Sequence, residues 1–386
     1  MVMPPTPQTR LPKVGTTIFT VISQLALDHG AVDTGQGFPD FQPPERLREL
    51  VVRHLHAHHN QYAPMAGVVA LREAIAAKVL RHYGRHVSPA TEVTVTCGGT
   101  EALASSIQAL IHPGDEAIVL EPAYDSYEPI VELCGGTVRR VPLSRPDFAV
   151  DWQKVRDAMS PRTRLVIVNS PHNPSGACLS PGDLDSLAEA IRGTGAFVLS
   201  DEVYEHMVFD GQAHASLNAH PELASRSIVV SSFGKTYHAT GWKIGYCVAP
   251  PALTAELRKV HQFLTFAIAT PLQHAIADFM IECPQWEQEL AAFYQAKRDR
   301  LVHLISGSRL RFVPARSTYF QLVDYSAISD LADTEFSLGL IQSPGVATIP
   351  ISPFCSQPPA AERIVRLCFA KQDATLVAAA ERLVAL

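Results

Sequence analysis

The chain has 386 residues, too many for one small core, and it fits two or three domains or one large domain with a smaller companion. Hydrophobic residues account for 47% of the chain and charged residues for 18%, as in compact soluble proteins, and no apolar run approaches the roughly 20 residues of a transmembrane helix. A net charge of -6 argues against sequence-independent binding to nucleic acid or to an anionic membrane.

The beginning of the chain and the cysteines predict the compartment. Residues 1–15 are proline-rich and polar without the apolar core of a secretion signal, so we expect a loose arm there. The 7 cysteines include no CxxC pair, and an odd number suits a reducing compartment. We therefore predict a cytoplasmic protein.

A helix and a turn follow the arm. Between residues 16 and 29 the apolar residues, Phe19 among them, recur at helical spacing. The segment GQGFPDF then combines two glycines with a proline. Such a turn lets the backbone at Gly37 approach a ligand closely, although a purely structural turn explains the glycines equally well.

The segment RHLHAHHNQY is rich in histidine, with His54, His56, His58 and His59. In a continuous helix His54 and His58 share one face, an arrangement that can bind a metal ion. No acidic residue or cysteine stands at ligand spacing, and a histidine-rich surface helix is the commoner structure, so we expect no metal site. A proline and a glycine then leave Tyr62 on an irregular loop before a second helix over residues 68–83.

Beyond residue 88 short apolar runs alternate with helical segments. The runs cover residues 92–96, 117–120, 165–168, 196–199, 228–230 and 246–249. Strands that are buried on both faces and separated by helices of crossover length indicate an α/β protein with a doubly wound, mostly parallel sheet. In that fold ligands bind outside the carboxyl ends of the strands, so the residues after each run form the candidate site.

Two glycines follow the first run and open a predicted helix that extends to residue 110. At Gly99 and Thr100 such a helix presents free backbone N–H groups and the positive end of its dipole, which suits a phosphate. A glycine pair before a helix is weak evidence, because a structural turn is the commoner reason for it.

Three further candidates follow the next runs. Tyr124 stands in EPAYDSYEP after the second run, Asn173 in the rigid turn NSPHNPSG after the third, and Asp201 directly after the fourth. A carboxylate at such a buried position needs a cation or a hydrogen-bond donor. All three residues are expected at the same edge of the sheet.

The fifth run leads into SSFGKTYHATGWKIGY, which contains Lys235. Between Ser227 and Gly241 there is no acidic residue and no other basic residue except a histidine. A lysine desolvated in this way has a lowered amine pKa, so it can attack a carbonyl group and carry a proton. The alternative is a lone buried lysine that local hydroxyl groups satisfy.

The last part of the chain predicts a second, smaller domain, with long helices after residue 255 and strands over 311–323, 346–349 and 364–369. In the last strand Arg366 lies between two apolar residues. A guanidinium there calls for an anionic partner, and a carboxylate held by two hydrogen bonds is the natural one. An edge-strand arginine that faces water is the other explanation.

Together these residues fit pyridoxal 5'-phosphate (PLP). Its aldehyde would form a Schiff base with Lys235, its phosphate would lie at Gly99, and Tyr124 would stack on its ring. Asp201 would keep the ring nitrogen protonated, so that the ring can accept the electrons of a substrate carbanion.

Six pieces of sequence extend this interpretation: QGFPDF, NQYAPMAG, PHNPSG, SDEVYEH, SSFGKTYHATGWKIGY and RLCFA. In this order, and spread over nearly the whole chain, they resemble the class I/II aminotransferases of PLP fold type I. Within the family the chain is most similar to the bacterial methionine aminotransferase branch, which is related to the kynurenine/glutamine transaminases. The resemblance implies an N-terminal arm at residues 1–40 that is part of the small domain, a large PLP-binding domain at 41–280 and the small C-terminal domain at 281–386.

The resemblance also implies a role for each matching residue. Lys235 would be the Schiff-base lysine and the acid and base that moves the proton, and with Asp201 and Tyr204 it forms the catalytic set. The other cofactor-binding positions are Gly99, Thr100, Tyr124, Asn173, Ser232, Lys243 and, from the neighbouring subunit of a homodimer, Tyr62. The substrate is expected to contact Arg366 through its α-carboxylate, with Gly37, Phe19 and Asn173 nearby.

Two positions depart from the family pattern. Lys243 stands where many relatives have an arginine, so a point charge rather than a planar fork would hold the phosphate. The turn NPSG replaces the common NPTG, a change that we expect to be neutral.

The implied activity is ping-pong transamination from methionine and from aromatic or other apolar amino acids to a 2-oxo acid. A broad substrate range is expected, because an apolar pocket separates methyl-scale differences by only about 10- to 200-fold. A kynurenine/glutamine transaminase and a cysteine-S-conjugate β-lyase are alternatives with the same cofactor residues. A non-catalytic PLP-dependent transcription regulator would need a basic DNA-binding domain, for which this acidic chain has no room.

Overall fold

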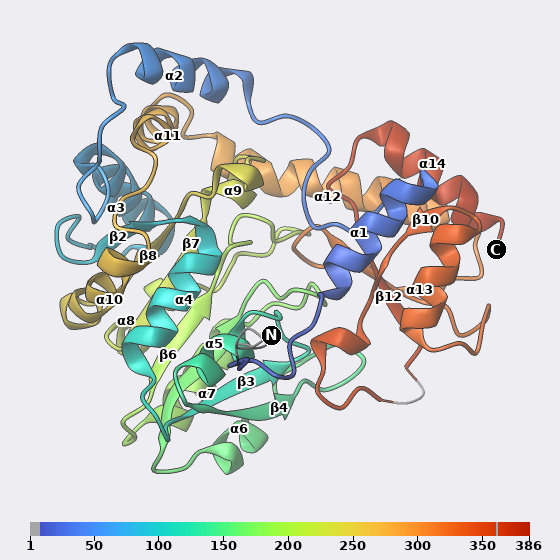
Figure 1. Cartoon of the computed structure of the whole chain (residues 1–386), viewed down its shortest axis with the longest axis horizontal. Helices are drawn as coiled ribbons and strands as arrows, with labels where there is room; N and C mark the ends of the chain where they lie inside the picture. Colours follow the sequence, from blue (N-terminus) through green and yellow to red (C-terminus); the bar gives the residue numbers. More distant parts are fainter. Residues whose placement is uncertain (1–7, 360–361) are drawn as a thin grey trace, which may run out of the picture.

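The computed structural model describes residues 8–359 and 362–386, and it confirms the predicted α/β fold with a large, mostly parallel sheet. The seven strands of this sheet lie in the order β2-β8-β7-β6-β5-β3-β4 (Figure 1). They are β2 (Val93–Thr96), β3 (Glu116–Glu121), β4 (Thr137–Pro142), β5 (Thr163–Asn169), β6 (Phe197–Asp201), β7 (Ser227–Ser232) and β8 (Gly245–Val248). Strand β8 alone runs in the opposite direction to the other six strands of the sheet.

All six predicted apolar runs contribute to this sheet, whereas β4 was not predicted. The exposed side chains of β4 include Arg139 and Arg140, so its sequence lacks the continuous apolar run of the inner strands. This pattern is typical of a strand at the edge of a sheet, which is the place of β4.

Helices cover both faces of the sheet, because successive residues of each inner strand point to opposite sides. Ala117 and Val119 of β3 pack with α4, α5 and α10, and Ile118 and Leu120 pack with α6, α7 and α8. The helices on the first face are α4 (Gly98–Leu110), α5 (Tyr127–Leu133) and α10 (Pro251–Leu264). Those on the second face are α6 (Trp152–Ala158), α7 (Pro181–Ile191) and α8 (Pro221–Ala224).

A third group of helices packs against β2, β8 and the short helix α9 (Phe233–Thr236). It consists of α2 (Glu45–His56), α3 (Val69–Tyr83) and α11 (Thr270–Glu282). Helix α2 ends at His56, and His58 has a left-handed backbone with φ 64°. His54 and His58 therefore do not share a helical face, and that prediction is wrong.

The N- and C-terminal parts of the chain fold together beside the large sheet (Figure 1). A parallel pair joins β1 (Val32–Asp33) to β10 (Val346–Ala347), and an antiparallel sheet has the order β11-β12-β9. Its strands are β9 (Phe320–Asp324), β11 (Ile349–Pro350) and β12 (Ile364–Cys368). The helices around them are α1 (Ile18–His29), α12 (Trp286–Ile305), α13 (Asp333–Gln342) and α14 (Asp373–Val384).

Two of the strands predicted for this region differ in extent. The predicted run 311–323 forms a regular strand only at β9, and its beginning contributes an isolated bridge between Arg311 and Asp324. The run 346–349 belongs to two different sheets, through β10 and β11. The domain boundaries at residues 40 and 280 stay predictions.

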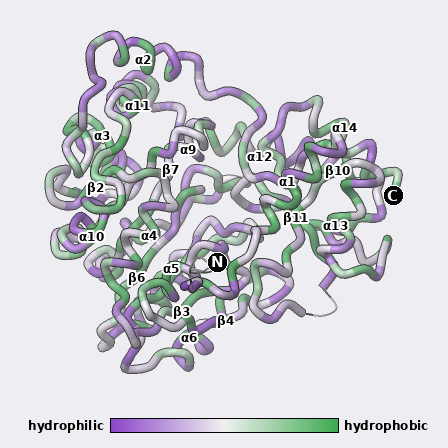
Figure 2. Tube along the Cα trace, viewed as in Figure 1, coloured by the Kyte–Doolittle hydropathy of each residue, from purple (hydrophilic) through white to green (hydrophobic). Residues whose placement is uncertain are grey.

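Hydrophilic stretches are prominent on the outer helix α2, whereas hydrophobic ones gather toward the sheets (Figure 2). Every helix in the described part of the chain is too short or too polar to cross a membrane.

Candidate active site

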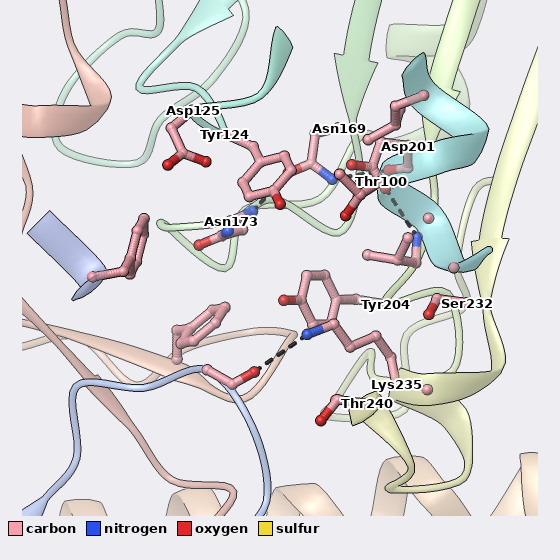
Figure 3. A pocket seen from close by; sticks show the side chains of 18 of the residues that line it. Thr100, Tyr124, Asp125, Asn169, Asn173, Asp201, Tyr204, Ser232, Lys235 and Thr240 are labelled. Atoms are coloured by element: carbon pink, nitrogen blue, oxygen red, sulfur yellow. Dashed lines mark hydrogen bonds between the residues drawn. The ribbon is translucent and has the colours of Figure 1, made fainter. Parts of the chain in front are cut away.

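The carboxyl ends of the strands meet at one pocket, as the predicted topology requires. β5 ends at Asn169, β6 at Asp201 and β7 at Ser232, and α4 begins beside them at Gly98. The pocket has a volume of about 320 Å³ (Figure 3). Every predicted site residue except Tyr62 lines it: Phe19, Gly37, Gly99, Thr100, Tyr124, Asn173, Asp201, Tyr204, Ser232, Lys235, Lys243 and Arg366.

Lys235 lies on α9, directly after β7. Its Nζ donates to the hydroxyl oxygen of Tyr319 at 2.8 Å and to the carbonyl oxygen of Gly37 at 3.2 Å. Burial lowers the pKa of the Lys235 amine to about 8, and the cations Lys243 and Arg366 act in the same direction. A fraction of the amine is therefore neutral near pH 7, as a nucleophile for an aldehyde requires.

Asp201 is the buried carboxylate of the pocket, with 4% of its surface exposed. Tyr127 donates its hydroxyl group to Oδ2 at 2.7 Å, and the backbone N–H of Val203 donates to Oδ1 at 3.3 Å. Burial raises the pKa of the Asp201 carboxyl to about 6, while these two hydrogen bonds and the charge of Lys235 act against that rise. At neutral pH the pocket thus contains a buried anion, which suits a protonated ring nitrogen.

Arg366 lies on the central strand of the small antiparallel sheet and is 1% exposed, so it is not an edge arginine that faces water. Nη1 donates to Oδ1 of Asn173 at 2.7 Å, and Nη2 donates to the carbonyl oxygen of Gly35 at 3.1 Å. Nε is buried and has no partner among the described residues. The guanidinium, which lies 3.9 Å from the centre of the Phe320 ring, keeps hydrogen-bonding capacity for an anion such as a carboxylate.

Ser232, Lys243 and the beginning of α4 form a polar end of the pocket. A Cβ atom on Gly98 would lie 3.3 Å from Nζ of Lys243, and one on Gly99 would lie 3.1 Å from the side chain of Val203. Glycine therefore keeps this space open, and the N–H groups of the first helical turn have no acceptor within the helix. Donors and positive charge fit a phosphate group here.

Tyr124, Asn173 and Tyr204 also point into the pocket (Figure 3). Burial raises the pKa of the Tyr204 hydroxyl group, so this group stays protonated and can donate a hydrogen bond. The amide oxygen of Asn173 accepts from Arg366, which leaves its NH₂ group as the donor for a ligand. The amine, the anion site, the buried carboxylate and the aromatic side chains together fit PLP.

Tyr62 lies outside the pocket, on the loop between α2 and α3, with 84% of its surface exposed. Its ring packs edge-on against Phe266, with 5.3 Å between ring centres. The predicted contact of Tyr62 with the phosphate of a neighbouring subunit stays a prediction.

Sequence reasoning missed three side chains that contact the predicted residues. Tyr319 hydrogen-bonds Lys235, Tyr127 hydrogen-bonds Asp201, and Phe320 lies against the guanidinium of Arg366. The two residues at positions 319 and 320 fall in a predicted strand, where aromatic side chains are common. Tyr127 shares the segment EPAYDSYEP with Tyr124, and that second tyrosine was the available signal.

The fold and this set of side chains define a PLP-dependent enzyme that acts on amino groups. The family described as aminotransferase class I and II matches residues 23–383, and the chain belongs to this family. It is an aminotransferase, and its cofactor is PLP.

Individual relatives narrow the comparison. The chain is 53% identical to the methionine aminotransferase of Escherichia coli (strain K12) over 377 residues, which cover 98% of this chain and 97% of the relative. A solved E. coli structure with a methionine aminotransferase function gives a TM-score of 0.96 at 52% identity and covers 99% of this chain and 100% of that chain. The kynurenine–oxoglutarate transaminase of Dictyostelium discoideum is 31% identical, over 98% of this chain and 96% of the relative. These similarities confirm the family and the branch that the motifs predicted.

We expect Arg366→Lys to lower kcat/KM for an amino-acid donor on the order of 10²- to 10³-fold, because an ammonium group cannot replace the planar fork of donors in a buried site. Steady-state kinetics should place most of the loss in KM. Arg300→Lys, at a half-exposed position on α12, should leave both constants unchanged. An Arg366→Lys enzyme with unaltered KM would contradict the carboxylate-binding role.

Proposed function

We propose that the enzyme transfers the α-amino group of methionine, and of aromatic or other apolar amino acids, to a 2-oxo acid by a ping-pong mechanism. The observation that carries this proposal is the presence, in one pocket, of the Lys235 amine with its lowered pKa and the buried guanidinium of Arg366. The similarity to the E. coli methionine aminotransferase supports methionine as a donor.

The side chains of the pocket supply binding and proton transfer. Bound PLP supplies an electron sink for the negative charge that develops at the substrate α-carbon. In the proposed mechanism Arg366 binds the α-carboxylate and thereby orients the α-carbon. The Nζ atom of Lys235 would then take the proton from the substrate α-carbon and serve as its carrier, and the Asp201 carboxylate would pair with the ring nitrogen of bound PLP and keep that nitrogen protonated.

Aromatic side chains around Arg366 support a preference for a thioether or an aromatic donor. Phe19 packs edge-on against Phe354 at 5.7 Å between ring centres, and the guanidinium lies 5.6 Å from the first ring and 5.5 Å from the second. Contacts between a thioether sulfur and an aromatic ring contribute roughly 0.3–1.5 kcal/mol, so such a wall favours methionine over an aliphatic side chain of equal size.

A panel of amino donors against several 2-oxo acids tests this proposal. Methionine should rank first in kcat/KM, with aromatic amino acids within about 10- to 200-fold of it, because an apolar wall discriminates weakly. Incubation with a cysteine S-conjugate should give an oxo acid only when an amino acceptor is present. Release of ammonia and pyruvate without an acceptor would instead favour a β-lyase, and preference for kynurenine or glutamine would refute the methionine assignment.

We further propose a homodimer in which Tyr62 reaches the cofactor phosphate of the other subunit. Phe266, the aromatic partner of Tyr62, is itself exposed, and so are the preceding apolar residues Phe263, at 89%, and Leu264, at 49%. Such exposed apolar residues mark an interaction surface. Sedimentation equilibrium should show twice the chain mass, and Tyr62→Ala should weaken cofactor binding although the side chain lies outside its own pocket.

The proposed compartment is the cytoplasm, which the 7 free cysteines and the absence of any CxxC pair support. The proposed ligands are small amino acids and 2-oxo acids, without a nucleic-acid or membrane partner, in keeping with the net charge of -6.

A further inference from the structure

Three histidines outside the active site converge between α2 and α11. His54 lies on α2, His59 on the loop after it and His274 on α11, and the three rings stack at centre distances of 4.0 to 5.3 Å. One ring nitrogen from each histidine lies within 4.8 Å of the others. None of the three residues lines the active-site pocket, so this cluster has no part in the proposed reaction.

Asp278 fixes the tautomer of the most buried histidine of the cluster. Its Oδ2 lies 2.8 Å from Nε2 of His54 and also pairs with Arg53. A carboxylate accepts hydrogen bonds, so Nε2 of His54 donates to it, and in the neutral ring this leaves the lone pair on Nδ1. That Nδ1 atom points toward Nδ1 of His59, at 2.9 Å.

Converging histidine nitrogens, with a carboxylate that orients one of the rings, are features of protein metal sites. In protein metal sites a ligating histidine commonly donates its second N–H to a carboxylate, which orients the ring. The metal ion would bind the neutral form of the three imidazole rings.

We propose that His54, His59 and His274 bind one divalent transition-metal ion of the zinc class, with water as the fourth ligand. At a zinc–nitrogen distance of about 2.0–2.1 Å, tetrahedral ligand nitrogens lie about 3.3 Å apart. To bind the ion, the rings therefore have to rotate. The distance between the Nδ1 atoms of His54 and His59, now 2.9 Å, has to increase slightly, and the His274 nitrogen has to move closer to both. His59 and His274 are only partly buried, so an ion can reach the cluster from solvent.

A second cluster shows what distinguishes this site. His82, His206 and Glu287 also bring three ligand atoms within 4.8 Å of one another. There the carboxylate already pairs with Arg81 at 2.7 Å, and Lys78 lies close by in an ion pair with Glu205 at 2.6 Å. These cations occupy the place that a metal charge would take. At the histidine cluster the nearby cation Arg53 pairs with Asp278, the outer carboxylate, and not with a ligand histidine.

An ion at this site would tie α2 and α11 to the loop that carries Tyr62, three residues after His59. It would thus hold the beginning of that loop without touching the substrate. The expected effect is on thermal stability and not on turnover.

Titration of the untagged holoenzyme with Zn²⁺ against a chromophoric chelator tests the site. We expect one ion per chain, a rise in the thermal midpoint, and with Co²⁺ the visible d–d absorption of a tetrahedral complex. His59→Gln and His274→Gln should each weaken the affinity at least tenfold, and Asp278→Asn should weaken it about 10- to 100-fold through the orientation of His54. Transamination and the cofactor spectrum should be unchanged in all three variants.

His56→Gln provides the matched control, because His56 is an exposed histidine on the same segment that lies outside the cluster. This variant should bind the ion as the parent enzyme does. Absence of stoichiometric binding in the parent enzyme would overturn the proposal, and so would an affinity that falls in His56→Gln but not in His59→Gln and His274→Gln.

Discussion

The Lys235→Ala enzyme is expected to lose on the order of 10⁴-fold in kcat, because one amine serves both as the attachment point of the cofactor and as the base that moves the α-proton. The lysine-linked absorption band of the purified enzyme should disappear, although the phosphate end of the pocket remains to bind the free cofactor. Stopped-flow spectroscopy with methionine measures the proton-transfer step directly. A small added amine should restore part of the rate, since it can carry the proton in place of the side chain.

Lys259→Ala is the control for this experiment, because Lys259 is an exposed lysine on α10 with a surface ion pair to Glu256. Its spectrum and its rate should match those of the parent enzyme. If Lys235→Ala retained both the absorption band and normal turnover, Lys235 would have no place in the reaction.

The Asp201→Asn enzyme is expected to lose on the order of 10²- to 10³-fold in kcat, because a neutral amide cannot stabilise a protonated ring nitrogen in a buried site.

The same Asp201→Asn change should stabilise the folded apoenzyme at neutral pH. Burial raises the pKa of Asp201 from 3.8 to about 6, so the unfolded chain releases this proton at lower pH than the folded protein does. Ionisation of Asp201 therefore begins to lower the stability as the pH rises above 3.8, and the full effect is present above about 6.

A difference of this size corresponds to about 3 kcal/mol, as an order of magnitude, at 1.36 kcal/mol per pKa unit. Urea unfolding of the two apoenzymes between pH 4 and pH 8 measures it. The stability of Asp201→Asn relative to the parent should increase through this interval and then level off. A relative stability that did not vary with pH would show that Asp201 ionises with an ordinary pKa in the folded protein.

The central strands and the residues at their carboxyl ends could be predicted because both follow from local patterns. Each inner strand is a short apolar run; Asp201 directly follows one of these runs, and Lys235 lies in the segment that another run leads into. The contacts that complete the site could not be predicted in this way, because they join distant segments. Tyr319 is 84 residues from Lys235 in the chain, and Tyr127 is 74 residues from Asp201.

The histidine segment shows the same limit. The prediction that His54 and His58 lie together assumed one continuous helix over this segment, but α2 ends at His56. The partners of His54 are instead His59, after the turn, and His274, which α11 brings from more than two hundred positions away. A contact of that kind follows from the packing of two helices and leaves no periodic signal.

The pairing of β1 with β10 affects how the chain folds as it is synthesised. Thr34 donates its hydroxyl group to the carbonyl oxygen of Ala347, 313 residues later. At about 5 to 20 residues per second, the ribosome needs roughly 15 to 60 s to add that length. During this interval the apolar side of α1, which in the finished protein packs against Ile341 and Ile349, is uncovered on the nascent chain. Helix α1 is thus synthesised well before the residues against which it packs.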